Sequence, residues 1–419
     1  MKQWDEIRAG FQRPFWVANI TEMFERLSYY AVFAVLALYL HDKLNFTSEK
    51  AASLTGTFGF IAWFLPIFGG AVVDKIGYRR ALSTAYFVLS IAYFVFGSIG
   101  APWMASIRNA VPLEALVLAV LVLPPLGMAL VKPSVVGTTG AASSEKVRPI
   151  GYSIYYTMVN IGSTCGPLLA GWFYGSKWPE SVFVMAAVSV ALMFFVVLIF
   201  FRNPGTAGDA PSKSLAQIGR DFITVLGNWR FVLFLVIFSG YWICYWQQFL
   251  ILPLYITQYI PGGASANAVA ILSVDPFTVI LLTVAINALM RKVPSFRAVI
   301  IGTLVTALAW LVIAAHASVF TAVLSLVVLA LGEIIQSPRY YDYVSRLAPE
   351  GQQGTYMGFA FAPIGIGSFF GGRFGGALLH HFGEVTHQPQ LIWPIVTGIG
   401  VLTALLLWVY DRTLAPRAA

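Results

Sequence analysis

The chain has few charged residues for its length. Of its 419 residues, 11% are charged and 58% are hydrophobic, with 26 Lys and Arg against 18 Asp and Glu. A soluble domain has about 25% charged residues. This shortage excludes an ordinary soluble protein and predicts a polytopic membrane protein that crosses the bilayer many times.

Cysteine, histidine and the motifs of enzymes are also scarce. The chain has 2 Cys and 5 His, and Cys165 and Cys244 stand in separate apolar segments, which excludes a disulfide framework. The sequence has no nucleophile elbow, phosphate-binding loop or metal-ligand spacing. His380, His381 and His387 occur without a supporting group of acids. We therefore expect no enzyme, no cofactor and no metal site.

Long apolar runs fill most of the chain. A helix needs about 20 mostly apolar residues to cross the bilayer core, and runs such as "VFVMAAVSVALMFFVVLIFF" lack the alternation of a transmembrane strand. Twelve such segments are expected, near 14–40, 54–73, 80–100, 113–137, 150–174, 178–201, 230–258, 267–290, 297–316, 318–346, 354–381 and 391–410. The predicted fold class is an all-α membrane protein of twelve transmembrane helices.

Positive charge is concentrated in alternate loops. With the N-terminus placed in the cytoplasm, the outer loops carry only Lys43, Lys50, Arg108 and Lys177, and most other Lys and Arg fall on the inner side. This is the bias of the positive-inside rule, so both termini are expected in the cytoplasm, in a multi-pass protein of the plasma (inner) membrane. The net charge of +8 thus reports topology, and no nucleic-acid partner is expected. Without a coiled coil or a large soluble domain, we expect a monomer.

The longest connection divides the segments six plus six. It covers 202–229, and its Pro, Gly, Ser and basic residues indicate a cytoplasmic linker. The expected domains are a six-helix bundle over 1–201 and a second one over 230–419. This layout resembles the major facilitator superfamily, which implies a solute site at the midplane between two halves that rock to expose it alternately.

The loop between the second and third segments, "GGAVVDKIGYRR", strengthens this resemblance. Its Gly70, Asp74, Gly77, Arg79 and Arg80 are similar in spacing to the cytoplasmic loop signature of the superfamily. Gly77 suits a tight turn, and Asp74 can face a helix N-terminus. We expect these five residues to act as a conformational latch on the inner side.

Glycine is concentrated in two of the segments. Gly162 and Gly166, at i, i+4 spacing, allow two helix backbones to approach closely. The segment near 354–381 is denser, with Gly371, Gly372 and Gly375 among its glycines. Close packing and bending at a gate both explain this density, and both interpretations stay open.

Ionisable residues interrupt the first apolar segment at "NITEMFERLSYY", residues 19–30. Helical spacing places six residues on one face, with Glu25 beside it: Asn19, Glu22, Arg26, Tyr29, Tyr30 and Phe33. A charge at this depth costs about 2.5–3.5 kcal/mol on insertion scales, so it faces the bundle interior or water and finds a partner. Glu22 and Arg26 can pair at i, i+4, but two acids then share one base.

Later segments contain four more ionisable residues: Lys132, Asp275, Glu333 and Arg373. If all of these residues face one cavity together with the charges of the first segment, acids outnumber bases. An unmatched buried acid can lose its proton when water or a cation arrives and take it up again later. We therefore expect this cluster to couple proton movement to transport.

The stretch "EMFERLSYY" is similar to the E-x-x-E-R-[aromatic]-x-Y-Y signature of the proton-dependent oligopeptide transporter family. Four further stretches match in order: "GMALVKPSV", "YSIYYTMVNIGSTCGP", "YWICYWQQ" and "GEIIQSPRYYDYVSRLAPEGQQGTYMGFAF". The resemblance implies a proton symporter of short peptides. It implies proton coupling by Glu22, Glu25, Arg26, Lys132 and Glu333. The expected substrate-binding residues are Tyr29, Tyr30, Phe33, Trp63, Lys132, Tyr156, Asn160, Trp242, Trp246, Gln247, Asp275, Glu333 and Ser337.

The chain departs from that family mainly at pocket positions. Phe33 stands where an arginine is common, Trp246 where an acid is common, and Asp275 where an asparagine is usual. Trp63 and Ala360 replace a tyrosine and a tryptophan. A pocket with fewer fixed bases holds anionic groups less well, so we expect neutral or cationic solutes, or peptides held by their amino end.

Two other functions remain open from the sequence. Asp275 and the aromatic residues Phe33, Trp63, Trp242 and Trp246 suit an antiporter that exports drug-like organic cations. A membrane receptor would bind a solute without moving it. The ordered charges of the first segment favour the symporter.

Overall fold

The computed structural model describes residues 10–175, 180–204, 215–349 and 353–414. The described residues form helices and turns, apart from one isolated bridge between Phe11 and Ser143, so the all-α prediction is confirmed. Contacts between Cα atoms group the chain into two compact units. Unit 1 comprises Met1–Val32 and Leu65–Ile218, and unit 2 comprises Phe33–Phe64 and Gly219–Ala419.

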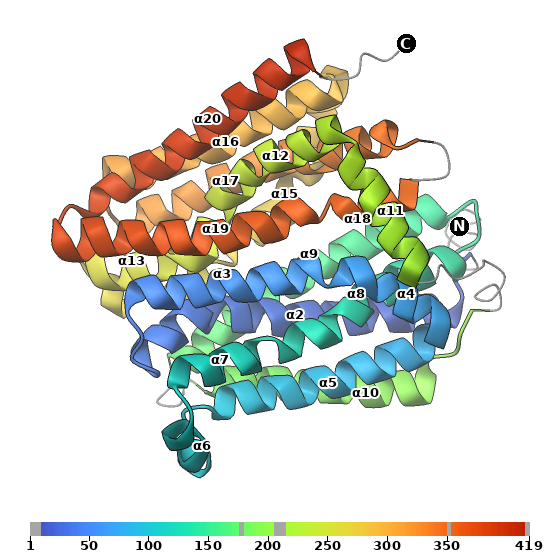
Figure 1. Cartoon of the computed structure of the whole chain (residues 1–419), viewed down its shortest axis with the longest axis horizontal. Helices are drawn as coiled ribbons and strands as arrows, with labels where there is room; N and C mark the ends of the chain where they lie inside the picture. The colour runs from blue at the N-terminus through green and yellow to red at the C-terminus, as the bar shows by residue number, and fades with distance from the viewer. Residues whose placement is uncertain (1–9, 176–179, 205–214, 350–352, 415–419) are drawn as a thin grey trace. The chain divides into compact units, whose positions relative to one another are not determined.

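Unit 1 is built around a row of packed helices. Its helices are the first part of α2 (Arg13–Asp42), α4 (Pro66–Ile76), α5 (Tyr78–Ser98), α6 (Ala105–Ala110), α7 (Leu113–Leu121), α8 (Leu123–Ala141), α9 (Arg148–Tyr174) and α10 (Ser181–Phe200), with the turn η1 (Pro102–Met104). Helix α5 packs against both α8 and α10, and α8 also contacts α4 and α9 (Figure 1). The charged stretch of the first segment therefore lies in a unit whose helices are in close contact.

Unit 2 contains the rest of α2 and most of the second half of the chain. Its longer helices are α3 (Ser48–Phe64), α12 (Trp229–Leu250), α15 (Val274–Leu289), α16 (Ser295–Ala315), α17 (Val319–Leu347), α19 (Ala362–Leu378) and α20 (Ile392–Thr413). Its shorter elements are α13 (Leu252–Tyr259), α14 (Ala268–Ile271), α18 (Gln353–Phe359), η2 (Gly263–Ser265), η3 (Met290–Lys292), η4 (Leu379–Val385) and η5 (Pro389–Leu391). Helix α16 packs against α17 and α20, and α19 packs against α3 and α12 (Figure 1).

Prolines divide several of the expected spans into two helices. Pro66 begins α4, and Pro124, Pro253 and Pro363 lie in the first turns of α8, α13 and α19. Proline lacks the amide hydrogen and disfavours the helical conformation of the residue before it. The spans expected at 54–73, 113–137, 230–258 and 354–381 are accordingly each divided between two helices, although α7 and α8 together still form one span of 29 residues, Leu113–Ala141.

All twelve expected segments coincide with helices of the described part. Nine helices there are long and apolar enough to cross a membrane, or ten if α3 and α4 count as one broken span. The segments near 150–174 and 354–381 are not among them. The first is the polar-rich α9, and the second is divided between α18 and α19, which has only 17 residues.

The expected linker at 202–229 contains a helix, α11 (Leu215–Gly227). Residues 205–214 of this linker lie outside the described residues. The division of the chain at 201 and 230 stays a prediction.

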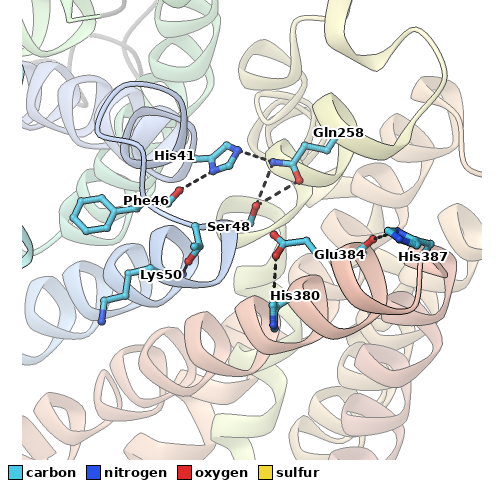
Figure 2. A network of polar contacts seen from close by, with 10 residues as sticks. His41, Phe46, Ser48, Lys50, Gln258, His380, Glu384 and His387 are labelled. Atoms are coloured by element: carbon cyan, nitrogen blue, oxygen red, sulfur yellow. Dashed lines mark hydrogen bonds and ion pairs between the residues drawn. The ribbon is translucent and has the colours of Figure 1, made fainter.

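Polar side chains join α2, α3 and α13 at one end of unit 2. Figure 2 shows His41 donating from Nδ1 to the carbonyl oxygen of Phe46 at 2.8 Å, while Nε2 accepts from the amide of Gln258 at 3.0 Å. Gln258 also exchanges hydrogen bonds with Ser48. Because the carbonyl oxygen of Phe46 can only accept, this hydrogen bond places a proton on Nδ1 of His41.

Candidate functional site

The first half of α2 carries buried polar residues into unit 1. Asn19, Glu22 and Glu25 are 0% exposed, and Arg26 is 4% exposed. The amide nitrogen of Asn19 donates to the carbonyl oxygen of Phe15 at 2.8 Å. These side chains lie in the interior of α2, which runs for 30 residues without a break. Charged groups persist there only where they pair.

Arg26 lies between the two glutamates. Its Nε and Nη2 both lie 2.6 Å from Oε2 of Glu25, whereas Nε lies 3.5 Å from Oε1 of Glu22. The guanidinium group also covers the Tyr29 ring, 5.0 Å from its centroid. The arginine is thus paired mainly with Glu25, the neighbouring residue, and only loosely with Glu22.

Glu22 is the less satisfied of the two acids. Both of its carboxylate oxygens are buried, and within the described ranges no group donates a hydrogen bond to them, whereas Glu25 has one such oxygen. Lys132 of α8 lies within electrostatic range of Glu22, Glu25 and Arg26. Because a buried carboxylate without donors is costly, Glu22 is the acid that this pairing leaves unsatisfied.

Helix α9 approaches the charged face of α2 through its glycines. A Cβ atom at Gly162 would lie 2.9 Å from Cβ of Arg26 and 3.0 Å from the amide nitrogen of Leu27. A Cβ atom at Gly166 would lie 2.6 Å from the carbonyl oxygen of Leu27. These distances leave no room for a side chain, so the two helix backbones are in direct contact. Close packing explains this glycine pair.

Two other predicted residues lie on α9. Asn160 is 8% exposed, and its amide nitrogen donates to the carbonyl oxygen of Tyr156 at 2.9 Å. Tyr156 is 43% exposed. The tyrosine ring is therefore accessible from outside the packed helices, and the asparagine is held against its own helix.

Unit 2 brings two acids to one tyrosine. Oδ2 of Asp275, a residue that is 2% exposed at the start of α15, accepts hydrogen bonds from Tyr245 at 3.0 Å and Gln248 at 3.1 Å. Glu333 of α17 lies within electrostatic range of Asp275 and within hydrogen-bonding range of Tyr245. Among the described residues of unit 2, no lysine or arginine acts on either carboxyl group. The described part of unit 2 thus contains a pair of acids without a base of its own.

Aromatic rings gather around Trp246 on α12. Phe33 meets it edge to face at 5.3 Å between centroids, and Trp242 and Trp63 lie at 5.8 Å and 6.3 Å. The indole nitrogen of Trp246 donates to the carbonyl oxygen of Ile364 at 3.0 Å, which fixes the ring. The positions at which the resemblance implies an arginine and an acid therefore form an aromatic cluster, which suits apolar and cationic groups.

The remaining predicted residues have different surroundings. Gln247 is buried, and its amide donates to the carbonyl oxygens of Ile243 at 2.7 Å and Gly371 at 3.2 Å, so it joins α12 to α19. Tyr30 and Ser337 are partly exposed. The predicted residues of unit 1 are Glu22, Glu25, Arg26, Tyr29, Tyr30, Lys132, Tyr156 and Asn160. Those of unit 2 are Phe33, Trp63, Trp242, Trp246, Gln247, Asp275, Glu333 and Ser337.

Sequence analysis missed Tyr245 and Gln248, which hold Asp275. They lie three residues apart on α12 and therefore share a face. The available signal was the run "YWQQ" inside an apolar segment, because a glutamine amide buried among apolar side chains needs a polar partner from another helix. Asp275, a buried acid on another helix, is the partner that this glutamine needs.

The predicted latch loop forms the turn between α4 and α5. Gly77 has φ +80°, a conformation that favours glycine. The Arg79 amide donates to Oδ1 of Asn203 at 3.0 Å, and its Nη2 donates to the carbonyl oxygen of Leu198 at 2.7 Å. Asp74 is exposed in the last turn of α4. These contacts lie within unit 1, and the latch stays a prediction.

The histidines near the C-terminal end make local contacts. His380 Nδ1 lies 2.8 Å from Oε2 of Glu384, four residues later on η4 (Figure 2). This hydrogen bond to Glu384 raises the pKa of His380 above its usual value. The described ranges contain no group of three or more His, Cys, Asp or Glu side chains that could hold a metal ion.

The sequence matches a known family model over most of its length. The model described as Major Facilitator Superfamily matches residues 19–372 and again 263–418. The first match begins at Asn19, at the charged stretch of α2, and continues through α19 as far as Gly372.

Individual relatives have low identity and nearly complete coverage. The multidrug resistance protein MdtH of Escherichia coli (strain K12 / DH10B) is 23% identical over 406 residues, 95% of this chain and 94% of MdtH. A POT family transporter solved with 5-aminolevulinic acid has a TM-score of 0.78 at 19% identity, covering 96% of this chain and 97% of that one. The nucleoside transporter NupG has a TM-score of 0.79 at 14% identity, covering 94% and 99%. Because their names indicate different solutes, the shared fold leaves the solute open.

Proposed function

This chain is an integral membrane transporter that belongs to the major facilitator superfamily, and we propose that it is a proton-coupled symporter of short peptides or peptide-like small solutes, working by alternating access. The observation that carries the proposal is the buried group of charges on α2, where two acids contact one arginine. A purely structural ion pair needs one acid for that arginine. The second acid is costly to bury. We infer that it is there because it can carry a proton.

Glu22 is the proposed proton carrier of the group. Arg26 keeps its contacts with Glu25 in either state of Glu22, because those contacts are 2.6 Å long and the one to Glu22 is 3.5 Å. Uptake of a proton by Glu22 therefore changes the charge near Lys132 without breaking the main ion pair. We propose Glu25, Arg26, Lys132 and Glu333 as the other members of the proton-coupling set.

We further propose that Asp275 and Glu333 receive the cationic group of the solute. These two acids attract an amine, because no lysine or arginine in the described part of unit 2 acts on them. The aromatic cluster around Trp246 can contact the apolar part of the same solute. A peptide would then be held chiefly through its amino end. Neutral and cationic peptides should be preferred over anionic ones.

Transport by purified protein in proteoliposomes tests the coupling. A thermal-shift screen of dipeptides and organic cations first selects the labelled probe. The Glu22→Gln, Glu25→Gln double variant should lose uphill uptake driven by a proton gradient and keep counterflow, which needs no net proton movement. Glu145→Gln, at an exposed glutamate of the same unit, serves as the control. Uphill uptake by the double variant at the rate of the unchanged protein would defeat the proposal.

A second candidate is a proton-coupled antiporter that exports drug-like organic cations. The acid pair beside an aromatic cluster favours it, since this combination binds bulky cations, and so does the likeness to MdtH. The direction of the gradient separates the two functions. A symporter accumulates the probe on the side to which protons flow, and an antiporter moves it the opposite way.

The arrangement in the membrane is also part of the proposal. We propose that both termini face the cytoplasm, on the charge bias of the loops. We also propose that the protein works as a monomer, since its sequence has no coiled coil and no large soluble domain. Labelling of single cysteines placed at Lys43 and Arg412 in intact cells tests the topology. Reaction at position 412 from outside would contradict it.

A further inference from the structure

A groove lies where α5 begins and α10 ends, within unit 1. It has a volume of about 910 Å³, and its walls include Arg79, Arg80, Ser83 and Thr84 of α5 and Leu198 of α10. Neither the proton-coupling set nor the proposed solute site uses this groove. Among the described residues, its lining contains two arginines, two hydroxyl groups and no acid.

The groove carries positive charge that is not neutralised by its neighbours. The Arg79 guanidinium is held by the carbonyl oxygen of Leu198, which carries no net charge. For Arg80, which is exposed, the described part of the chain provides no ion-pair or hydrogen-bond partner. The first turn of α5 adds the positive end of a helix dipole. The Ser83 hydroxyl is buried in the wall without a hydrogen-bond partner in the described ranges.

An apolar stripe continues from the groove along α5. Arg80, Thr84, Phe87, Ile91 and Phe94 follow one another at intervals of three and four residues, so they share one face, and all are exposed. The stripe is basic and hydroxylated at the helix start and purely apolar beyond Thr84. A ligand that fits its length has an anionic head and a long apolar tail.

The neighbouring face of α10 widens this apolar surface. Leu192, Phe195 and Ile199 of α10 are exposed, and the rings of Phe87 and Phe194 lie 5.8 Å apart, so the two helices form one continuous surface. In a membrane protein such a surface faces the acyl chains. The groove therefore lies where a phosphate headgroup meets those chains.

We propose that this groove binds the headgroup of an anionic phospholipid. Its phosphate lies between Arg79 and Arg80, and its acyl chains follow the stripe on α5 and the exposed face of α10. Arginine suits this role because its planar guanidinium group can donate two hydrogen bonds to one phosphate. A free phosphate would use the arginines and leave the stripe without a role, which is why the observations favour a lipid.

The test measures lipid binding by the full-length protein in detergent micelles. The probes are dioleoylphosphatidylglycerol, which is anionic, and dioleoylphosphatidylcholine, which has the same chains and no net charge. The test variant is Arg80→Gln, since the Arg80 side chain has no partner in the described part whose loss would affect folding. The control is Arg297→Gln, because Arg297 is also exposed and is likewise the third residue of its helix, α16.

The expected result is specific for both the lipid and the site. The unchanged protein and Arg297→Gln should bind phosphatidylglycerol more tightly than phosphatidylcholine. Arg80→Gln should weaken phosphatidylglycerol binding about fivefold, the factor for one lost Lys or Arg near an anionic lipid, and leave phosphatidylcholine binding unchanged.

Three results would overturn the proposal. Equal binding of the two lipids would show that the groove does not recognise charge. An equal loss in Arg297→Gln would show that only net charge matters. Displacement of phosphatidylglycerol by inorganic phosphate or glycerol phosphate at similar concentrations would assign the groove to a soluble anion.

Discussion

Neutralising one acid of α2 at a time should affect stability unequally. Glu25→Gln removes a carboxylate that contacts two nitrogens of Arg26 at 2.6 Å. Glu22→Gln removes one that contacts a single nitrogen at 3.5 Å and has no hydrogen-bond donor in the described part. Glutamine keeps the shape of glutamate in both cases. The difference between the two variants therefore reports the pairing of Arg26.

The magnitudes follow from these contacts. Loss of one partner from a buried ion pair costs about 3–5 kcal/mol. The amide that replaces the Glu25 carboxylate still offers one neutral acceptor oxygen, and a neutral hydrogen bond has roughly half the strength of a charge-assisted one. We therefore expect Glu25→Gln to lower the free energy of unfolding by about 2 kcal/mol. Glu22→Gln should change it by less than about 1 kcal/mol, because the long contact it loses is offset by removal of a poorly hydrogen-bonded charge.

The double variant should be less stable than the sum of the single changes predicts. Either single variant leaves Arg26 with one carboxylate, whereas the double variant leaves a buried arginine without one, beside the charge of Lys132. We expect a non-additive term of about 1–3 kcal/mol, the range for residues in one network. Such a term arises only if both acids act on the same base.

Unfolding of the purified protein in detergent, followed by tryptophan fluorescence, measures these differences. Glu145→Gln is the control, since this exposed glutamate should change stability by less than about 0.5 kcal/mol. Greater destabilisation by Glu22→Gln than by Glu25→Gln, or strict additivity in the double variant, would refute the shared position of Arg26.

Three further predictions concern other parts of the chain. Gly162→Val should destabilise the protein by about 1–3 kcal/mol, because the side chain would enter the α2 backbone; in thermal unfolding, Gly227→Ala, with open space around it, is the control. Asp275→Asn should weaken binding of cationic probes in the thermal-shift assay and leave neutral ones unchanged, and equal effects on both would contradict its proposed role. His380 should titrate above its usual pKa in NMR of histidine-labelled protein. Because its folded pKa is raised, its ion pair with Glu384 stabilises the fold at low pH and is lost as pH rises through that pKa. Glu384→Gln should remove most of the shift, and the charge of Glu49 accounts for the smaller remainder.

Much of the helix pattern could be predicted from the sequence. Each apolar run of the sequence coincides with helix in the described part of the structure. The reason is that a bilayer core admits only backbone whose polar groups are paired within the helix. The breaks within the spans were missed, although Pro66, Pro124, Pro253 and Pro363 mark them in the sequence. The length of an apolar run indicates a span but not where its helix is interrupted, which depends on the local effect of proline.

The partners of the charges were harder to predict. Helical spacing favoured a pair between Glu22 and Arg26, but the structure places Arg26 closest to Glu25, the adjacent residue. A long side chain can fold back along its own helix, and its direction depends on what packs around it. Here the close approach of α9 at Gly162 limits the space beside Arg26.

The sequence by itself determined the class of the protein, the positions of its helices and the presence of unmatched acids inside them, since these follow from hydrophobicity and from the cost of burying charge. The tertiary structure alone decided which groups meet. Asp275 is held by Tyr245 and Gln248 of another helix, and Arg79 reaches the end of α10. Contacts of this kind depend on the packing of helices that are distant in sequence, and no local pattern encodes that packing.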